Sequence, residues 1–460
     1  MRPTLGSLGG AVRLWKGGRS PQLSDRDQRR LRDQIAACLE AGVSEVSARA
    51  RAAEVADLYA GLDDVGRGRF FELLALEYGP DRGAVEAAIE ARRAVTVRDA
   101  LDQHELAAAD LALRRALTPP RARLLTLFNG LDHGLALLVE LRAELLPLLA
   151  QDARLRSLEV DLEGLLKSWF DIGLLELRRL SWDSPAALLE KLIRYEAVHS
   201  ISSWADLKNR LDSDRRCYAF FHPGMPDEPL IFVEVALVSG LADNVGPLLD
   251  TDAPLGDPGR ADTAIFYSIS NCQPGLAGIN LGDFLIKRVV RRLAAELPSL
   301  KTFATLSPMP GFRRWLDARL AEEGDRAFRD AETAALAAAL DGAGPAEVMA
   351  RLLADPSWPE EPSRAGALRP ALVRLGARYL IQERARGRAI DPVANFHLSN
   401  GASVERINFL ANASPQGIAQ SAGLMVNYRY DLSSIDANVE AYLATGRSAA
   451  AGALTRLLAG

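Results

Sequence analysis

The chain has 460 residues, of which 48% are hydrophobic and 25% are charged, and its formal net charge is −5 at pH 7. This composition is ordinary for a soluble globular protein, and the length predicts about two to four domains. The slightly acidic balance excludes the overall basic field that attracts nucleic acid. No apolar stretch reaches the ~20 residues that a membrane span requires, so we expect no membrane partner.

The three cysteines, Cys38, Cys217 and Cys272, are odd in number and far apart. Their spacing fits neither a disulfide framework nor a zinc site, and it indicates free thiols in a reducing compartment. Residues 1–20 are basic and rich in glycine but lack the apolar core of a secretory signal. We therefore expect a disordered lead-in over residues 1–20 and a cytoplasmic protein.

Apolar residues recur at helical spacing through the first third of the chain. Leu31, Ile35 and Cys38 fall on one helical face, and residues 55–62 repeat the pattern. No period-2 segment precedes about residue 170, so residues 21–168 are predicted to form an all-α domain. Leu-rich helical faces often mediate self-association, and we expect a homo-oligomer formed through this domain.

The remaining residues, 169–460, show strand patterns mixed with helices. Runs rich in β-branched and aromatic residues predict strands at 217–221, 230–238, 262–270 and 302–306. A helix is predicted over 283–297, a helical Ala-rich stretch over 326–353, and an exposed loop over 356–362. The fold class is therefore α+β, with a helical bundle followed by a mixed α/β domain.

The strand at 262–270 leads into a glycine-containing loop that opens the helix at 283. Gly275, Gly278 and Gly282 would let the backbone approach a ligand, and a helix N-terminus favours an anion. The spacing matches neither a Walker A box nor the G-x-G-x-x-G fingerprint. Two interpretations stay open, namely a plain turn-forming loop and a site for an anion such as a pyrophosphate. The order of the elements resembles the coenzyme A loop of the GNAT acyltransferase fold.

Several segments in the same order resemble the malonyl-CoA decarboxylase family. They are YEAVHSISSWADLKNRL (195–211), FYSISNCQPGLAGINLGDFLIKRVV (266–290), TLSPMPGFRRWL (305–316), NFHLSNGASVERINFLANAS (395–414) and SAGLMVNYRY (421–430). The resemblance implies a helical N-terminal domain followed by a GNAT-like catalytic domain. It also implies the conversion of malonyl-CoA into acetyl-CoA and carbon dioxide.

The same resemblance assigns site residues. Ser307 and His397 match the catalytic pair of the family, and Ser268 and Tyr430 match polar positions of its site. The malonyl-CoA-binding loop matches Ala277, Gly278, Ile279, Asn280, Leu281, Gly282 and Asp283. Asn280 stands where members of the family carry glutamate. Tyr430 is predicted to lie on a helix.

Decarboxylation of a malonyl thioester leaves an enolate that must be stabilised and then protonated at C2. The thioester is itself the electron sink, so we expect no metal and no cofactor. We expect His397 to donate the proton because imidazole titrates near neutral pH, and Ser307 to hold the carboxylate. The competing hypotheses are a coenzyme A-dependent GNAT-type acyltransferase, which needs a nucleophilic amine, and a non-catalytic acyl-CoA sensor.

Overall fold

The computed structural model describes residues 25–40, 42, 44–95, 100–279, 281–340 and 344–459. The predicted lead-in over residues 1–20 and the site residue Asn280 lie outside these ranges. The chain divides into two compact units. The helical unit comprises Met1–Leu175, His222–Pro226 and Gln273–Ile279. The sheet unit comprises Glu176–Phe221, Asp227–Cys272 and Asn280–Gly460.

The helical unit contains the predicted all-α region. Its elements are α1 (Asp25–Leu39), α2 (Glu45–Ala60), α3 (Asp64–Leu76), α4 (Arg82–Ala94), α5 (Ala100–Leu117), α6 (Pro120–Asn129), α7 (Gly134–Leu148), η1 (Ala153–Leu155), α8 (Arg156–Trp169), η2 (Ile172–Leu174) and η3 (Pro274–Leu276). Side-chain caps define several starts, because Ser44, Asp63 and Asp81 each accept a backbone N–H from three residues further on. Phe70, Leu124 and other apolar residues of these helices are fully buried and form the core of the unit.

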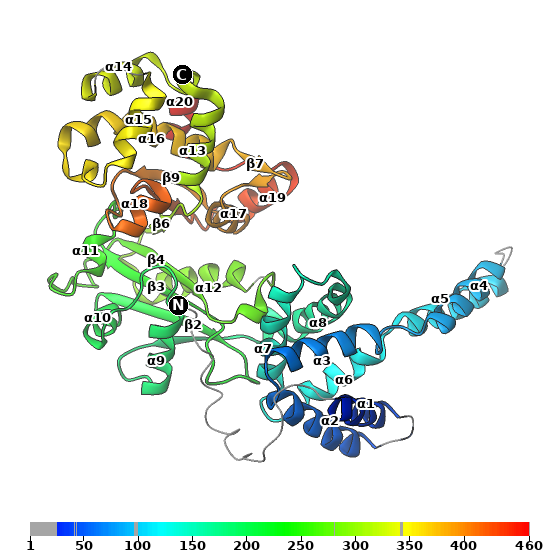
Figure 1. Cartoon of the computed structure of the whole chain (residues 1–460). Coiled ribbons are helices and arrows are strands. Elements are labelled where there is room, and N and C mark those ends of the chain that lie inside the picture. Colours follow the sequence, from blue (N-terminus) through cyan, green and yellow to red (C-terminus); the bar gives the residue numbers. More distant parts are fainter. Residues whose placement is uncertain are drawn as a thin grey trace. The chain divides into compact units, whose positions relative to one another are not determined.

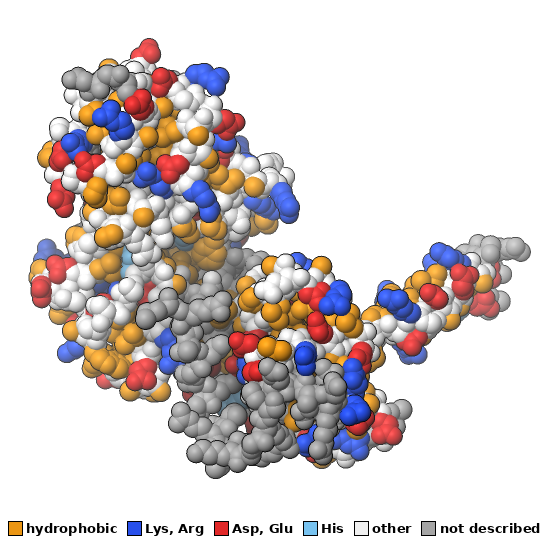
Figure 2. Space-filling view, in the orientation of Figure 1, with side chains coloured by type: hydrophobic (Ala, Val, Ile, Leu, Met, Phe, Trp, Pro, Cys, Tyr) orange, Lys and Arg blue, Asp and Glu red, His pale blue; other side chains and the backbone are white. Residues whose placement is uncertain are grey.

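Helices α4 and α5 lie side by side as a hairpin (Figure 1). Charged side chains of both signs alternate with apolar ones along this hairpin in the space-filling view (Figure 2). Leu111 and Leu117 of α5 are about half exposed, at 49% and 50%. The hairpin therefore presents apolar side chains that the helical unit itself does not cover.

The sheet unit is built on an eight-stranded sheet in the order β1-β2-β3-β4-β5-β10-β6, with β9 paired to β10. The strands are β1 (Glu176–Leu180), β2 (Arg215–Phe221), β3 (Ile231–Val238), β4 (Thr263–Asn271), β5 (Thr302–Thr305), β6 (Ser307–Pro308), β9 (Ser403–Asn408) and β10 (Met425–Arg429). Among the described pairs of this sheet, β4 and β5 run parallel, and α12 (Gly282–Glu296) connects them. The predicted order of an all-α region followed by a mixed α/β domain is confirmed.

Both faces of the first strands are covered. Side chains of α9 (Ala186–Tyr195) and α10 (Trp204–Arg210) share a core cluster with Cys217, Ala219 and Phe221 of β2. The alternate residue Tyr218 donates a hydrogen bond of 3.1 Å to Glu296 of α12. Helix α12 therefore covers the opposite face, since neighbouring residues of a strand point to opposite sides.

Further helices follow α12 and complete the unit. They are α13 (Phe312–Glu323), η4 (Gly324–Ala327), α14 (Asp330–Ala339), α15 (Pro345–Ala354), η5 (Trp358–Glu360), α16 (Pro362–Ile381), α17 (Pro392–Ser399), α18 (Pro415–Ser421), α19 (Ile435–Thr445) and α20 (Gly452–Ala459); α11 (Gly246–Leu249) precedes β4, and β7 (Arg384–Ala385) pairs with β8 (Arg388–Ala389). Among the described residues, no helix is long and apolar enough to cross a membrane.

Two local predictions are wrong. Tyr430 is not on a helix but directly follows β10, which pairs with β5, β6 and β9. This strand lies inside the sheet and is buried on both sides, so its sequence shows no alternation. The predicted exposed loop over 356–362 contains the 3-10 turn η5, whose Trp358 is fully buried.

Candidate active site

Three of the predicted site residues meet in one chain of hydrogen bonds. Ser307 lies on β6, which pairs with β10, and His397 lies in the last turn of α17. The Ser307 Oγ is 3.1 Å from Nε2 of His397, and Nδ1 of the same imidazole is 2.7 Å from the hydroxyl oxygen of Tyr430. All three side chains are buried. The structure therefore brings together Ser307, His397 and Tyr430.

The imidazole of His397 lies in an apolar environment. Its ring stacks on that of Tyr428, with ring centroids 4.5 Å apart, and meets the ring of Phe396 edge-on. Burial without a neighbouring charge lowers the pKa of His397 to about 3, because the charged form loses its hydration. The expectation that this histidine titrates near neutral pH is wrong, and His397 is neutral at pH 7.

A neutral imidazole carries one N–H, and the neighbouring bonds indicate which nitrogen bears it. The Ser307 hydroxyl donates to Oγ1 of Thr305 at 2.9 Å, and the same Thr305 oxygen accepts the backbone N–H of Tyr428. The Ser307 oxygen is then free to accept from Nε2 of His397, and Nδ1 accepts from the Tyr430 hydroxyl. The donors thus follow one direction, from Tyr430 through His397 to Ser307.

Ser307 and His397 open onto a cavity of about 240 Å³. Its walls are lined by Val198, Ile231, Phe266, Tyr267, Ser268, Ile269, Asn271, Ser307, Pro308, Pro392, Val393, Phe396 and His397. Most of these residues are apolar, and among the described residues no lysine or arginine lines the cavity. The cavity thus offers hydrogen bonds from a few polar groups but no cation.

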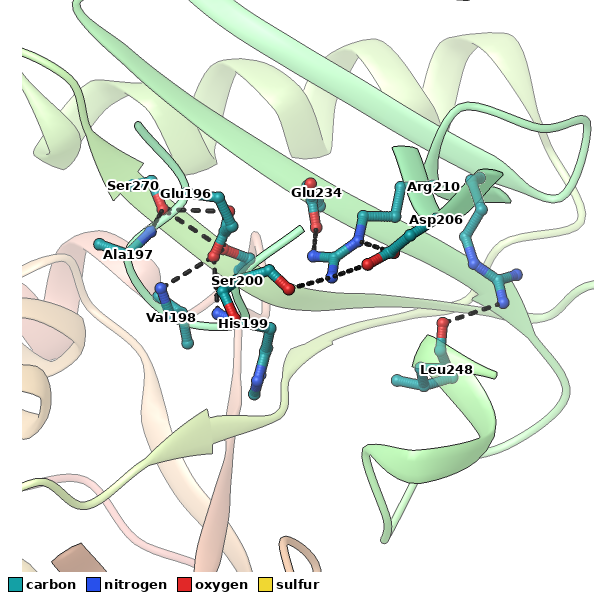
Figure 3. A network of polar contacts seen from close by, with 12 residues as sticks. Glu196, Ala197, Val198, His199, Ser200, Asp206, Arg210, Glu234, Leu248 and Ser270 are labelled. Atoms are coloured by element: carbon teal, nitrogen blue, oxygen red, sulfur yellow. Dashed lines mark hydrogen bonds and ion pairs between the residues drawn. The ribbon is translucent and has the colours of Figure 1, made fainter. Parts of the chain in front are cut away.

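Ser268 lies on β4 in the wall of this cavity, and its hydroxyl is held by Glu196, which is not among the predicted site residues. Both carboxylate oxygens of Glu196 lie 2.7 Å from the Ser268 Oγ. Glu196 also accepts the backbone N–H groups of Val198 and His199, each at 2.8 Å, and the hydroxyl of Ser270 at 3.1 Å (Figure 3). Glu196 therefore fixes the orientation of the Ser268 hydroxyl. Its only signal in the sequence is its place in the resembling segment 195–211.

A second buried carboxylate lies behind this wall. Glu234 of β3 is paired in register with Ser268 of β4, and it accepts a hydrogen bond of 3.0 Å from Arg210. Arg210 also binds Asp206 at 2.8 Å (Figure 3). Asp206 in turn accepts the backbone N–H of Ser202. Burial, together with the nearby Glu196 carboxylate, raises the pKa of Glu234 to about 8. The network ties the segment that carries Glu196 to the sheet.

The predicted binding loop is described on both sides of Asn280. Ala277, Gly278 and Ile279 belong to the helical unit. Arg142 of α7 donates hydrogen bonds of 2.7 Å to the carbonyl oxygens of Gly275 and Ala277, and it pairs with Glu159 of α8 at 3.0 Å. The loop carbonyls are therefore held by a buried guanidinium.

The glycines of this loop have separate explanations. A Cβ atom at Gly275 would lie 1.8 Å from the carbonyl oxygen of Val139, so close helix packing requires glycine there. Gly278 has a φ angle of +79°, which residues with a side chain rarely adopt. In the sheet unit, a Cβ atom at Gly282 would lie 2.4 Å from the Phe396 ring. Packing and turn geometry thus account for these three positions.

The remaining predicted binding positions lie in the sheet unit. Leu281 is the N-cap residue of α12, and Asp283 is in its first turn. Further along this helix, Lys287 lies 3.8 Å from Asp436, and the guanidinium of Arg288 lies over the ring of Phe220. In the part of the chain that the structure describes, no group of three His, Cys, Asp or Glu side chains is arranged to hold a metal ion.

Comparisons with known proteins cover nearly the whole chain. The family model described as malonyl-CoA decarboxylase C-terminal domain matches residues 173–460, and the one described as malonyl-CoA decarboxylase N-terminal domain matches residues 78–170. The chain is 38% identical to the mitochondrial malonyl-CoA decarboxylase of Anser anser anser over 410 residues, which is 86% of this chain and 81% of that one. The Rattus norvegicus protein of the same name is also 38% identical, covering 86% of this chain and 82% of its own.

Solved structures agree with these matches. The crystal structure of malonyl-CoA decarboxylase from Rhodopseudomonas palustris is 41% identical with a TM-score of 0.83, covering 93% of this chain and 99% of that one. The crystal structure of the protein of the same name from Agrobacterium vitis is 40% identical with a TM-score of 0.82 and the same coverage.

Proposed function

The chain belongs to the malonyl-CoA decarboxylase family, and from this membership and the geometry of the cavity we infer that it converts malonyl-CoA into acetyl-CoA and carbon dioxide. The observation that carries the proposal is the chain of hydrogen bonds from Tyr430 through His397 to Ser307 at the wall of a mostly apolar cavity. The following steps are proposed for this chain.

The cavity favours loss of carbon dioxide. A malonyl carboxylate carries a full charge, and burying it without a cation is unfavourable. When the bond between the carboxylate carbon and C2 breaks, the carboxylate leaves as neutral carbon dioxide. The electron pair of that bond stays with C2 and forms the enolate of the thioester. Apolar walls therefore destabilise the starting carboxylate more than the product. The hydroxyl of Ser307 turns from Thr305 toward the carboxylate and holds it in place.

The enolate then takes a proton at C2. Because His397 is neutral, the proton comes from the N–H of Nε2 and not from an imidazolium. As Nε2 loses its proton, Nδ1 gains the hydroxyl proton of Tyr430, so the imidazole stays neutral throughout. Tyr430 is left as a phenolate and recovers a proton from water. The step thus moves one proton from a phenol to carbon, with His397 as a two-sided relay.

The other assigned residues have supporting roles in this proposal. Ser268, oriented by Glu196, contacts the acyl group from the β4 side of the cavity. Residues 277–283 bind the coenzyme A part, and this assignment rests on the family resemblance. We propose that no metal or cofactor takes part, that the helical unit mediates self-association, and that the protein works in the cytoplasm. Exposed Leu111 and Leu117 support self-association, which light scattering on the purified chain would measure.

The test is to incubate the purified chain with malonyl-CoA alone and follow acetyl-CoA by chromatography. Acetyl-CoA that forms without an acceptor supports the decarboxylase. Consumption only after an amine is added would refute it in favour of an acyltransferase, and binding without turnover would favour a sensor. His397→Ala and Ser307→Ala should both abolish turnover, whereas His104→Ala, at an exposed histidine of α5, should not.

A further inference from the structure

Asp391 is a buried carboxylate that the proposed chemistry does not use. Its side chain is fully buried at the N-cap of α17, where Oδ1 accepts the backbone N–H of Ala394 at 2.9 Å. Oδ2 accepts the hydroxyl of Tyr379 at 3.0 Å. The same Oδ2 lies beside the turn before α13, since a Cβ atom at Gly311 would be 4.0 Å from it. One side chain thus binds groups from α16 and from the start of α17, and it lies against the turn before α13.

The turn before α13 and the start of α17 belong to the two segments that carry the hydrogen-bonded pair. Gly311 follows Ser307 by four residues, in the turn between β6 and α13, and His397 follows Asp391 by six residues on α17. We propose that Asp391 is a positioning residue for decarboxylation, because it holds the Ser307 turn and the His397 helix at the separation that their hydrogen bond requires. This inference rests on the proposed function of the cavity.

The packing around Tyr379 supports this role. A Cβ atom at Gly311 would lie 2.4 Å from the Tyr379 hydroxyl oxygen, so glycine at this position lets the phenol reach the carboxylate. The ring of Tyr379 is itself fixed between those of Phe312 and Trp315, whose centroids lie 5.7 and 5.3 Å away. The carboxylate is therefore held by a rigid neighbour, and through it the start of α17 is held as well.

Helix α17 depends on few such attachments. It has eight residues and lies outside the strand ladders, and its first residues, Pro392 and Val393, line the cavity. Asn395 accepts a hydrogen bond of 2.8 Å from Tyr442, which fixes the middle of the helix. Asp391 fixes its beginning. Loss of that anchor would let the first turn move relative to Ser307, and a displacement of 1 Å at a reacting group can lower a rate about 10²-fold.

The test compares the variants Asp391→Ala, Asp391→Asn and Tyr379→Phe with a matched control. Ser414→Ala removes a cap of the same pattern, since Ser414 precedes Pro415 and accepts the N–H of Gly417 at 3.1 Å, at the exposed start of α18. We expect Asp391→Ala to lower kcat about 10- to 100-fold with a change in KM below about threefold, because the reacting side chains move relative to each other while substrate binding is kept. Asp391→Asn keeps the cap and should lower kcat less than Asp391→Ala does. Tyr379→Phe should lower kcat in part, and Ser414→Ala should leave kcat unchanged.

A second measurement needs no turnover. In protein labelled with ¹⁵N at histidine, the side-chain shifts of His397, assigned through His397→Gln, report which ring nitrogen bears the proton. We expect the Nε2-protonated form in the wild type and a changed shift in Tyr379→Phe and Asp391→Ala. If the wild type fails to decarboxylate malonyl-CoA, the proposed function is wrong, while these shifts still test the positioning. The inference would be overturned if folded Asp391→Ala and Tyr379→Phe both kept the wild-type kcat and the wild-type His397 shifts. If Asp391→Ala does not fold, Tyr379→Phe alone decides the test.

Discussion

The neutral state of His397 leads to a prediction about the dependence of activity on pH. A histidine with an ordinary pKa of about 6.5 would be only about 3% neutral at pH 5. With its pKa lowered to about 3 by burial, His397 remains almost fully neutral at that pH. If the neutral N–H of His397 is the proton donor, kcat/KM should not fall as the pH decreases through 6.5. An enzyme that needs an ordinary neutral histidine would instead lose about 30-fold between pH 8 and pH 5.

The assay is the initial rate of acetyl-CoA formation at low malonyl-CoA concentration, measured from pH 5 to pH 8 at constant ionic strength. Circular dichroism at each pH shows that the protein stays folded. A flat profile through pH 6.5 agrees with a buried neutral imidazole. A 30-fold fall centred on pH 6.5 would mean that His397 titrates freely, and the proposed relay would then be wrong.

Three further predictions concern the surroundings of the pair. Tyr430→Phe removes the outer proton donor of the relay and should lower kcat roughly 10²-fold at unchanged KM; a kcat within twofold of the wild type would exclude the phenol as donor. Glu196→Ala removes the shared acceptor of four donors, most of them buried, and should destabilise the fold by about 3 kcal/mol or more, measured by urea unfolding. An unchanged midpoint would contradict the network in Figure 3. Gly275→Ala should lower the melting temperature because of the contact with Val139, whereas Gly366→Ala, at an exposed and open helix position, should not; equal effects would show that the first site relaxes freely.

Local patterns in the sequence predicted the elements that show clear periodicity. The β-branched run at 230–238 and the apolar spacing of 283–297 predicted β3 and α12 to within one residue at each end. Tyr430 was misplaced because a short apolar run in a strand buried on both sides looks the same as a helix segment. Trp358 was missed because its packing partners are distant in the chain.

The candidate site was predictable only in part. The resemblance supplied Ser307 and His397, but spacing alone shows neither their hydrogen bond nor the apolar surroundings that keep the imidazole neutral. Gly275 was open to interpretation as a ligand contact because its real neighbour, Val139, is 136 positions away in the sequence. Glu196 and Asp391 escaped notice for the same reason, since a carboxylate in a loop gives no sign of the donors that fold around it.

The hydrogen bonds of Arg142 bear on any attempt to shorten this protein. A truncated chain that starts after α8 would look like an independent catalytic domain, because it would keep the whole sheet and the Ser307–His397 pair. It would also leave the carbonyl oxygens of Gly275 and Ala277 without the guanidinium that binds them. Deleting α7 is therefore a mutation of the 275–277 turn as well as the removal of a domain. A minimal enzyme should retain that helix together with Glu159.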